Sequence, residues 1–198
     1  MNGDLLDLAA KVVSLRADGD RIAQKLLAKE ARILLLLNLY SGHENVVRMF
    51  GGFVVAGDAC IILELATSDL HAYMRTFHGG RVPEREGYQH AMELAAAVAF
   101  MHERGIAHRD IKLANVLLKS CDQATWIAVL ADFGLSVDVT TLEQSSGRSN
   151  TECGTKVTMA PEVHGGDWYN PRRSDVWSLG MTILALVVPN LFGYYAWS

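Results

Sequence analysis

Charged and amide side chains gather in one short stretch, HRDIKLAN, which covers residues 108–115 and is followed by the apolar residues VLL. It places a carboxylate (Asp110), an ammonium group (Lys112) and an amide (Asn115) on one predicted loop. Together, such groups could position a charged reactant. Taken singly, Asp110 is more often a solvated loop carboxylate and Asn115 a turn residue, because both residue types favour loops. The rest of the chain must decide between these interpretations.

Two other kinds of site are not supported by the spacing. The segment HERGIAH differs from HExxH, and its His102 and His108 would point to different faces of a helix. The cysteines, Cys60, Cys121 and Cys153, form no CxxC pair that would indicate zinc. Their odd number and wide separation favour reduced thiols in an intracellular protein.

Three further motifs follow the first along the chain. They are DFG at residues 132–134, APE at 160–162 and DVWSLG at 175–180. Together with HRDxxxxN they resemble the protein kinase family, in which the catalytic loop, DFG and APE come in this order. The resemblance covers roughly residues 7–188. A Lys two places after the Asp, here Lys112, resembles the pattern of the serine/threonine branch of the family.

The resemblance implies a chemistry for these residues. Kinases transfer the γ-phosphoryl group of ATP mainly by holding the reacting oxygens in line and neutralising the phosphate charge. Asp110 is then expected to orient the acceptor hydroxyl, and Lys112 to sit beside the transferred phosphate. Asn115 and Asp132 are expected to hold Mg²⁺ through oxygen ligands.

The family also places a phosphate-binding Lys on a strand and pairs it with a Glu on the next helix. LAAKVV at residues 8–13 is similar to that strand, which makes Lys11 the candidate. KEARILL resembles the helix, which makes Glu30 its partner. Both residues could instead be ordinary solvated surface charges.

Other positions follow from the resemblance alone, and each is more often plain core than a ligand contact. IILELA at residues 61–66 is similar to the strand that enters the hinge between the lobes. The residues expected around the nucleotide are Ala9 and Leu117 on the faces of adenine, Leu63 behind it, Glu64 to Ala66 at the hinge, and Asp69 at the ribose. The residues expected to stack between the lobes are Leu34, Met49, His108 and Phe133.

A long polar stretch, residues 136–156, has many Ser and Thr and little periodicity, which predicts a functional surface loop. Its end, TECGT, resembles the end of a kinase activation loop. Thr155 is then expected to line the acceptor site and Thr151 to be a phosphorylation site. Arg109 is expected to be the bidentate partner of that phosphate. The alternative is that both threonines are ordinary loop residues.

Three features depart from the family pattern. Gly3 is the sole glycine before Lys11, and the GxGxxG motif that covers the phosphates in kinases does not occur. The chain ends soon after a helix expected at 175–188, which leaves Glu162 without an evident Arg partner, and Thr158 stands where the family often has Tyr. We therefore expect a partial kinase domain, trimmed at both ends. A catalytically impaired, kinase-like binding module and a truncated product are the alternatives.

Composition limits the class of protein. Half of the residues are hydrophobic, and the net charge is −4 with no basic cluster, which predicts a globular chain without a nucleic-acid-binding surface. The N-terminal residues do not resemble a secretory signal, and the apolar run at 177–188 has the length of a buried core helix, not of a membrane span. We expect a cytoplasmic or nuclear protein that acts on Ser and Thr of other proteins.

Periodicity assigns elements to these segments. It predicts a strand at 7–15, a helix at 22–37 and a hairpin of strands 45–55 and 59–65. A helix capped by Ser68-Asp69 is expected to run to residue 77 and another to span 84–104, with short strands at 116–118 and 128–130. The expected fold is α+β with two lobes in one partial kinase domain, residues 1–198. The N-lobe, residues 1–66, is a small antiparallel sheet, and the C-lobe, residues 67–198, is mainly helical; both are incomplete.

Overall fold

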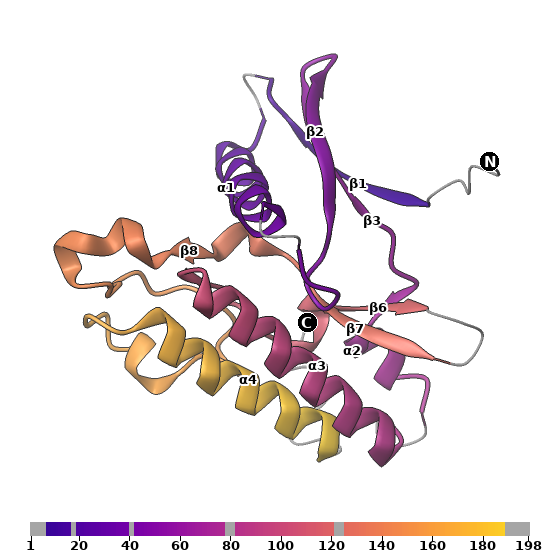
Figure 1. Cartoon of the computed structure of the whole chain (residues 1–198). Helices are drawn as coiled ribbons and strands as arrows, with labels where there is room; N and C mark the ends of the chain where they lie inside the picture. Colours follow the sequence, from indigo (N-terminus) through magenta and orange to yellow (C-terminus); the bar gives the residue numbers. More distant parts are fainter. Residues whose placement is uncertain (1–6, 17–18, 40–41, 78–81, 121–124, 189–198) are drawn as a thin grey trace.

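The computed structural model describes residues 7–16, 19–39, 42–77, 82–120 and 125–188, which form a small sheet-rich lobe and a larger helical one (Figure 1). The small lobe contains β1 (Leu8–Ser14), α1 (Arg21–Asn38), β2 (Met49–Val55) and β3 (Asp58–Glu64). The larger lobe contains the helices α2 (Leu70–Met74), α3 (Glu84–Glu103) and α4 (Pro171–Val187). Its strands are β4 (Ser68–Asp69), β5 (Ile106–Ala107), β6 (Val116–Ser120), β7 (Trp126–Leu130) and β8 (Val137–Asp138). Its 3₁₀ segments are η1 (Leu113–Asn115), η2 (Phe133–Leu135), η3 (Val139–Ser145) and η4 (Pro161–Val163).

The small lobe is an antiparallel sheet in the order β1-β3-β2 with α1 beside it. The predicted hairpin forms, and Ala56 and Gly57 in its turn have positive φ angles of 51° and 87°. Side chains on a strand alternate between the two faces of a sheet. Lys11 and Ile61 lie opposite each other in the β1–β3 register and therefore share a face, the one toward α1.

Helix α1 carries one carboxylate into the interior. It begins after Asp20, whose side chain accepts the backbone N–H groups of Ile22 and Ala23 and so satisfies donors that a helix start leaves unpaired. The buried face recurs every three or four residues, as expected for an amphipathic helix. Its members are Leu27, Glu30, Ile33, Leu34 and Leu37. Glu30 is the one charged member of this face.

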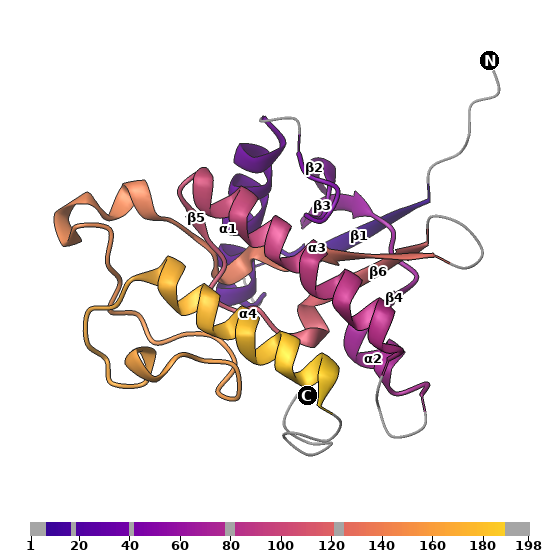
Figure 2. The same cartoon turned by 60° about the horizontal axis from the view of Figure 1, so that its bottom comes forward.

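The larger lobe is built around α3. Helix α4 packs along one side of α3 (Figure 2), and β7 also packs against α3. The strands β4, β6 and β7 form a second sheet, and β5 pairs with β8. One hydrophobic core joins the lobes, because it includes Leu34 and Ile61 from the small lobe together with Leu94, Val116 and Leu186 from the larger one.

Two helices differ from the prediction. Helix α2 ends at Met74, and the chain continues to Phe77 through turns with i→i+3 hydrogen bonds. Helix α4 begins at Pro171 because Asn170 caps it and Pro suits the first helical position. One face of α4 is open, since Trp177 is 46% exposed.

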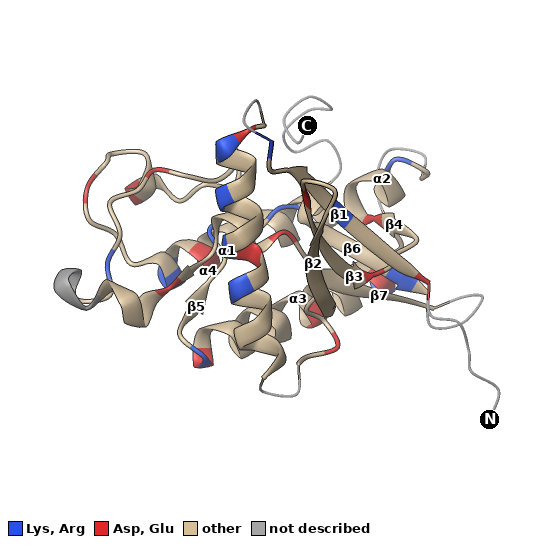
Figure 3. Cartoon of the chain, turned by 90° about the horizontal axis from the view of Figure 1, so that it is seen from above, with Lys and Arg blue, Asp and Glu red and all other residues tan. Residues whose placement is uncertain are grey.

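Both signs of charge occur in each lobe: Figure 3 shows Lys and Arg positions together with Asp and Glu positions in the small lobe and in the larger one. No helix in the described ranges is long and apolar enough to cross a bilayer.

Candidate active site

The loop between β5 and β6 gathers the charged residues that the sequence singled out. Thr155 Oγ1 donates to Asp110 Oδ1 at 2.7 Å. Lys112 Nζ lies 3.3 Å from Asp110 Oδ2 and 2.9 Å from Thr155 Oγ1. Asn115 Nδ2 donates to the backbone oxygen of Asp110 at 2.8 Å and to its Oδ2 at 3.0 Å. Asp110 is thus a buried carboxylate that contacts all three of these side chains.

Asp175, which was expected only to begin a helix, fixes the backbone of this loop. Its carboxylate is fully buried and accepts the N–H groups of His108 at 2.8 Å and Arg109 at 2.7 Å. His102 Nε2 lies 2.9 Å from the same carboxylate. These bonds hold Arg109 at a φ of 70°, in the left-handed region that is costly for a residue with a side chain. An Asp next to the apolar part of a helix was the available signal, because a buried charge requires partners.

Lys11 lies between two carboxylates from different segments. Its Nζ is 2.6 Å from Glu30 Oε2 on α1 and 3.1 Å from Asp132 Oδ1, just before η2. Burial alone would lower the pKa of Lys11, but the hydrogen bonds and charges of Glu30 and Asp132 raise it above its ordinary value. Burial raises the pKa of Glu30, and the contact with Lys11 opposes that rise. Burial acts in the same direction on Asp132, but there Lys11 outweighs it and the pKa is lowered.

Arg109 reaches from the loop to the polar stretch that follows η2. Its Nε donates to Leu135 O at 2.8 Å and its Nη1 to Ser149 Oγ at 3.4 Å. Ser149 Oγ also accepts the N–H of Thr151 at 3.2 Å, while Tyr169 donates its hydroxyl to Thr151 O. Thr151 is exposed. Arg109 is therefore linked to the Thr151 backbone through the Ser149 hydroxyl, which accepts a hydrogen bond from each.

Comparisons with known proteins agree with this geometry. The family model described as protein kinase domain matches residues 4–193. The chain belongs to the protein kinase family. CBL-interacting protein kinase 25 of Oryza sativa subsp. japonica is 32% identical over 186 residues, which cover 87% of this chain and 35% of that protein. Testis-specific serine/threonine-protein kinase 1 of Mus musculus is 31% identical over 186 residues, which cover 91% and 48%. The chain therefore spans less than half the length of these two relatives.

The residues expected around the nucleotide of a kinase lie near the strand end that joins the lobes. Ala9 lies opposite Leu63 in the β1–β3 register, and Leu117 lies on β6 in the larger lobe. Glu64 ends β3 and Ala66 follows it in the segment that leads to β4. All five are partly buried, so each keeps some surface that a ligand could cover.

Two of the expected nucleotide residues have side chains with partners of their own. The Glu64 carboxylate accepts the backbone N–H of Arg48 at 2.9 Å and Lys119 Nζ at 3.1 Å. The Asp69 carboxylate accepts the N–H of Ala72 at 2.8 Å and caps α2. The Glu64 carboxylate is thus already bonded within the chain, which leaves only backbone groups of Glu64 for a nucleotide. A ribose bound at Asp69 would share the carboxylate with the start of α2.

The four residues expected to stack between the lobes are all buried. Leu34, Met49 and Phe133 belong to the core that joins the lobes. The His108 ring meets Phe133 edge-on with 4.9 Å between ring centroids, and its Nε2 lies 3.0 Å from Ala131 O. Because Phe133 follows Asp132 directly, this packing also fixes the position of the Asp132 backbone.

The segment that contains the APE motif packs behind Thr155. Thr158, where kinases often have Tyr, is buried, and its hydroxyl donates to Thr155 O at 3.2 Å. Ser178 on α4 donates to Thr158 O at 2.8 Å. Glu162 is exposed and, within the described ranges, forms no ion pair.

Proposed function

We propose that the chain transfers the γ-phosphoryl group of ATP to serine and threonine hydroxyls of proteins. The observation that carries this proposal is the position of Lys11 Nζ, 2.6 Å from Glu30 and 3.1 Å from Asp132. Kinases need both the Lys–Glu ion pair and the DFG Asp in place before ATP is aligned. The name of the mouse relative, a serine/threonine-protein kinase, supports the choice of acceptor.

The loop residues take roles that follow from their contacts. Asp110 orients the acceptor hydroxyl and receives its proton. Lys112, 3.3 Å from the Asp110 carboxylate, supplies positive charge beside the transferred phosphate. Thr155, bonded to both residues, lines the place where the acceptor side chain enters.

Two oxygen groups fit Mg²⁺, which commonly takes one or two carboxylates and completes its shell with water and substrate phosphates. Asn115 donates from Nδ2 to Asp110, so its carbonyl oxygen can serve as a ligand. Asp132 is ionised at neutral pH because its pKa is lowered, despite burial, chiefly by Lys11. Asn115 and Asp132 would hold the ion, which neutralises charge on the phosphates when bound.

A second function, nucleotide or partner binding without phosphoryl transfer, is favoured by one observation. The side chains of Lys11 and Asp132 are 43% and 50% exposed. A glycine-rich loop covers the phosphates in kinases. An open site would admit water and align ATP less well.

The test is transfer of radiolabelled phosphate from Mg-ATP to a generic protein substrate by the native chain and by Asp110→Asn. We expect the variant to be slower by about 100-fold or more, the typical effect of a positioned acid or base. Its thermal shift with Mg-ATP should persist, because Asp110 acts on the acceptor and not on the nucleotide. Asp167→Asn, which changes an exposed carboxylate, is the matched control.

The results separate the two functions. Transfer by the native chain and the control, with loss in Asp110→Asn, supports the kinase. A native chain that is stabilised by Mg-ATP and transfers nothing supports the binding module. Equal rates for the native chain and Asp110→Asn would contradict the role given to Asp110.

A further inference from the structure

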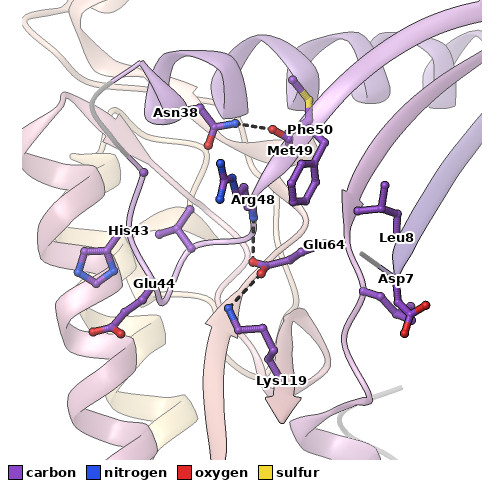
Figure 4. A pocket seen from close by; sticks show the side chains of 13 residues that line it. Asp7, Leu8, Asn38, His43, Glu44, Arg48, Met49, Phe50, Glu64 and Lys119 are labelled. Atoms are coloured by element: carbon purple, nitrogen blue, oxygen red, sulfur yellow. Dashed lines mark hydrogen bonds and ion pairs between the residues drawn. The ribbon is translucent and has the colours of Figure 1, made fainter. Parts of the chain in front are cut away.

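A cavity lies next to the end of β3, where the chain passes from the small lobe to the larger one. It has a volume of about 740 Å³ and opens between the start of β2, the end of β3, the segment after α1 and β6 (Figure 4). Sites for small molecules commonly have volumes of roughly 300 to 1,000 Å³. None of the catalytic or metal-binding candidates lines it. Its side chains come from Asp7, Leu8, Asn38, His43, Glu44, Val46, Arg48, Met49, Phe50, Glu64, Leu65 and Lys119.

The cavity offers apolar surface that a ligand could cover. Leu8, Phe50 and Leu65 are 44%, 41% and 48% exposed, so much of their surface faces water. Val46 and Met49, which are buried, also line the cavity and add apolar surface. Covering exposed apolar surface is favourable in proportion to the area removed from water. An apolar or aromatic body is therefore the part of a ligand that this cavity would hold.

Arg48 is the cation in the cavity that has no acidic partner. Its guanidinium lies 5.0 Å from the centre of the Phe50 ring, and in the part of the chain that the structure describes no carboxylate forms an ion pair with it. Glu64 is bound to the Arg48 backbone N–H and to Lys119 (Figure 4). Lys119 is thus neutralised, whereas the guanidinium keeps donors in a planar arrangement that suits a carboxylate.

Neighbouring groups limit the charge of the ligand. His43 Nδ1 accepts the N–H of Asn45 at 3.1 Å and its ring packs against Phe100 on α3, with 4.9 Å between ring centroids, so Arg48 remains the donor for an anionic group. Asp7 and Glu44 are exposed carboxylates that also line the cavity. They repel ligands with several negative charges, such as nucleoside triphosphates, more strongly than ligands with one. The combination favours a single carboxylate.

We propose that this cavity binds a small monoanionic carboxylate with an aromatic body, with the carboxylate on Arg48 and the ring against Phe50 and Leu65. The site is separate from the one proposed for ATP. It nevertheless shares Glu64 and Leu65 with the segment expected to meet the nucleotide, because both residues also line this cavity. The proposal does not depend on phosphoryl transfer.

The test titrates the whole chain with 3-phenylpropionate and with its uncharged analogue 3-phenylpropanamide, and follows the ¹³C-labelled methyl groups of methionine by NMR. We expect the acid to shift the Met49 signal in a saturable manner and to bind more tightly than the amide. Met159, which packs in a separate cluster with Ala160, Val163 and Tyr169, should not respond. Arg48→Ala should weaken binding of the acid by about fivefold, the scale of a partly exposed ion pair, and leave the amide unchanged.

Two matched variants keep the test decisive. Arg32→Ala removes the same charge from an exposed site on α1 outside the cavity and should bind as the native chain does. Arg48→Lys keeps the charge without the planar donor pair and should lie between native and Arg48→Ala. No saturable Met49 shift, equal affinity for acid and amide, or equal losses in Arg48→Ala and Arg32→Ala would overturn the proposal. Because none of these measurements uses ATP, failure here is distinct from failure of the kinase function.

Discussion

At the residue scale, the small lobe holds a buried carboxylate, Glu30, on the inner face of α1. Glu30 is 1% exposed, whereas the Lys11 side chain that pairs with it is 43% exposed. The pair therefore spans the boundary between core and solvent. Burial raises the pKa of Glu30, and Lys11 opposes that rise, so the ionised form of Glu30 depends on its partner.

Replacing Lys11 by Met should make stability depend on pH. Without Lys11 the pKa of Glu30 rises further in the folded chain, while in the unfolded chain it stays near 4.5. Between these two values the folded state binds a proton that the unfolded state does not, so the free energy of unfolding falls as pH rises. We expect Lys11→Met to be less stable than the native chain by about 2 kcal/mol at pH 8, and by less at pH 5. Urea unfolding at the two values measures this.

The double variant Lys11→Met/Glu30→Gln is the control. It removes both charges, so the difference between pH 5 and pH 8 should return to that of Glu30→Gln alone. If Lys11→Met loses the same stability at both values, then Glu30 does not depend on Lys11 as we argue.

Sequence could predict the residues of the site that belong to short motifs, and it missed those that act across long separations. The spacing of Lys11 and Glu30 and the order of Asp110, Asn115 and Asp132 were enough to select residues that the fold brings together. Asp175 was missed because its bonds go to backbone N–H groups 66 and 67 residues earlier. Every residue except proline has a backbone N–H, so residue type cannot indicate that these two N–H groups bind a distant carboxylate.

The same distinction holds at the scale of elements. The hairpin around Gly57 and a helix over residues 22–37 were predicted, because turn residues and apolar spacing act over short stretches of sequence. The two-residue strands β5 and β8 were not, since they pair only when the fold brings Ile106 to Asp138. The start of α4 at Pro171 was also missed, because a helix was expected only from residue 175.

Gly154 controls how closely the end of the polar stretch approaches the catalytic loop. Its φ is +109°, and a Cβ there would lie 2.5 Å from Arg109 O, a backbone atom that cannot move aside. We expect Gly154→Ala to lower the free energy of unfolding by at least about 2 kcal/mol, or to displace Thr155 from Asp110 and reduce phosphoryl transfer. Gly165→Ala, where the nearest atom is 3.8 Å away and φ is not positive, should change neither. Unchanged stability and rate in Gly154→Ala would show that this approach is not required.

At the scale of the whole molecule, two cations from different lobes meet at Leu135, just before the polar stretch. Lys29 on α1 and Arg109 on the catalytic loop both donate to Leu135 O, at 3.4 and 2.8 Å. Burial, followed by the charge of Arg109, lowers the pKa of Lys29. Two positive groups from different lobes are thus held together without an anion between them in the described residues. A phosphate on Thr151, which is linked to Arg109 through Ser149, would supply that anion.

Phosphorylation of Thr151 should therefore raise the rate of phosphoryl transfer, and Thr151→Ala should keep it low, with a difference of about tenfold or more. The physical reason is that a phosphate can pair with Arg109 and Lys29 at once and hold α1, and with it Glu30, toward the larger lobe. Lys29→Ala should lose part of the gain, whereas Lys25→Ala, an exposed change on the same helix, should keep it. Intact-protein mass spectrometry, read beside the transfer rate, measures both quantities. Fully active protein with unmodified Thr151, together with a Thr151→Ala variant of undiminished rate, would show that the cations at Leu135 serve only to pack the lobes together.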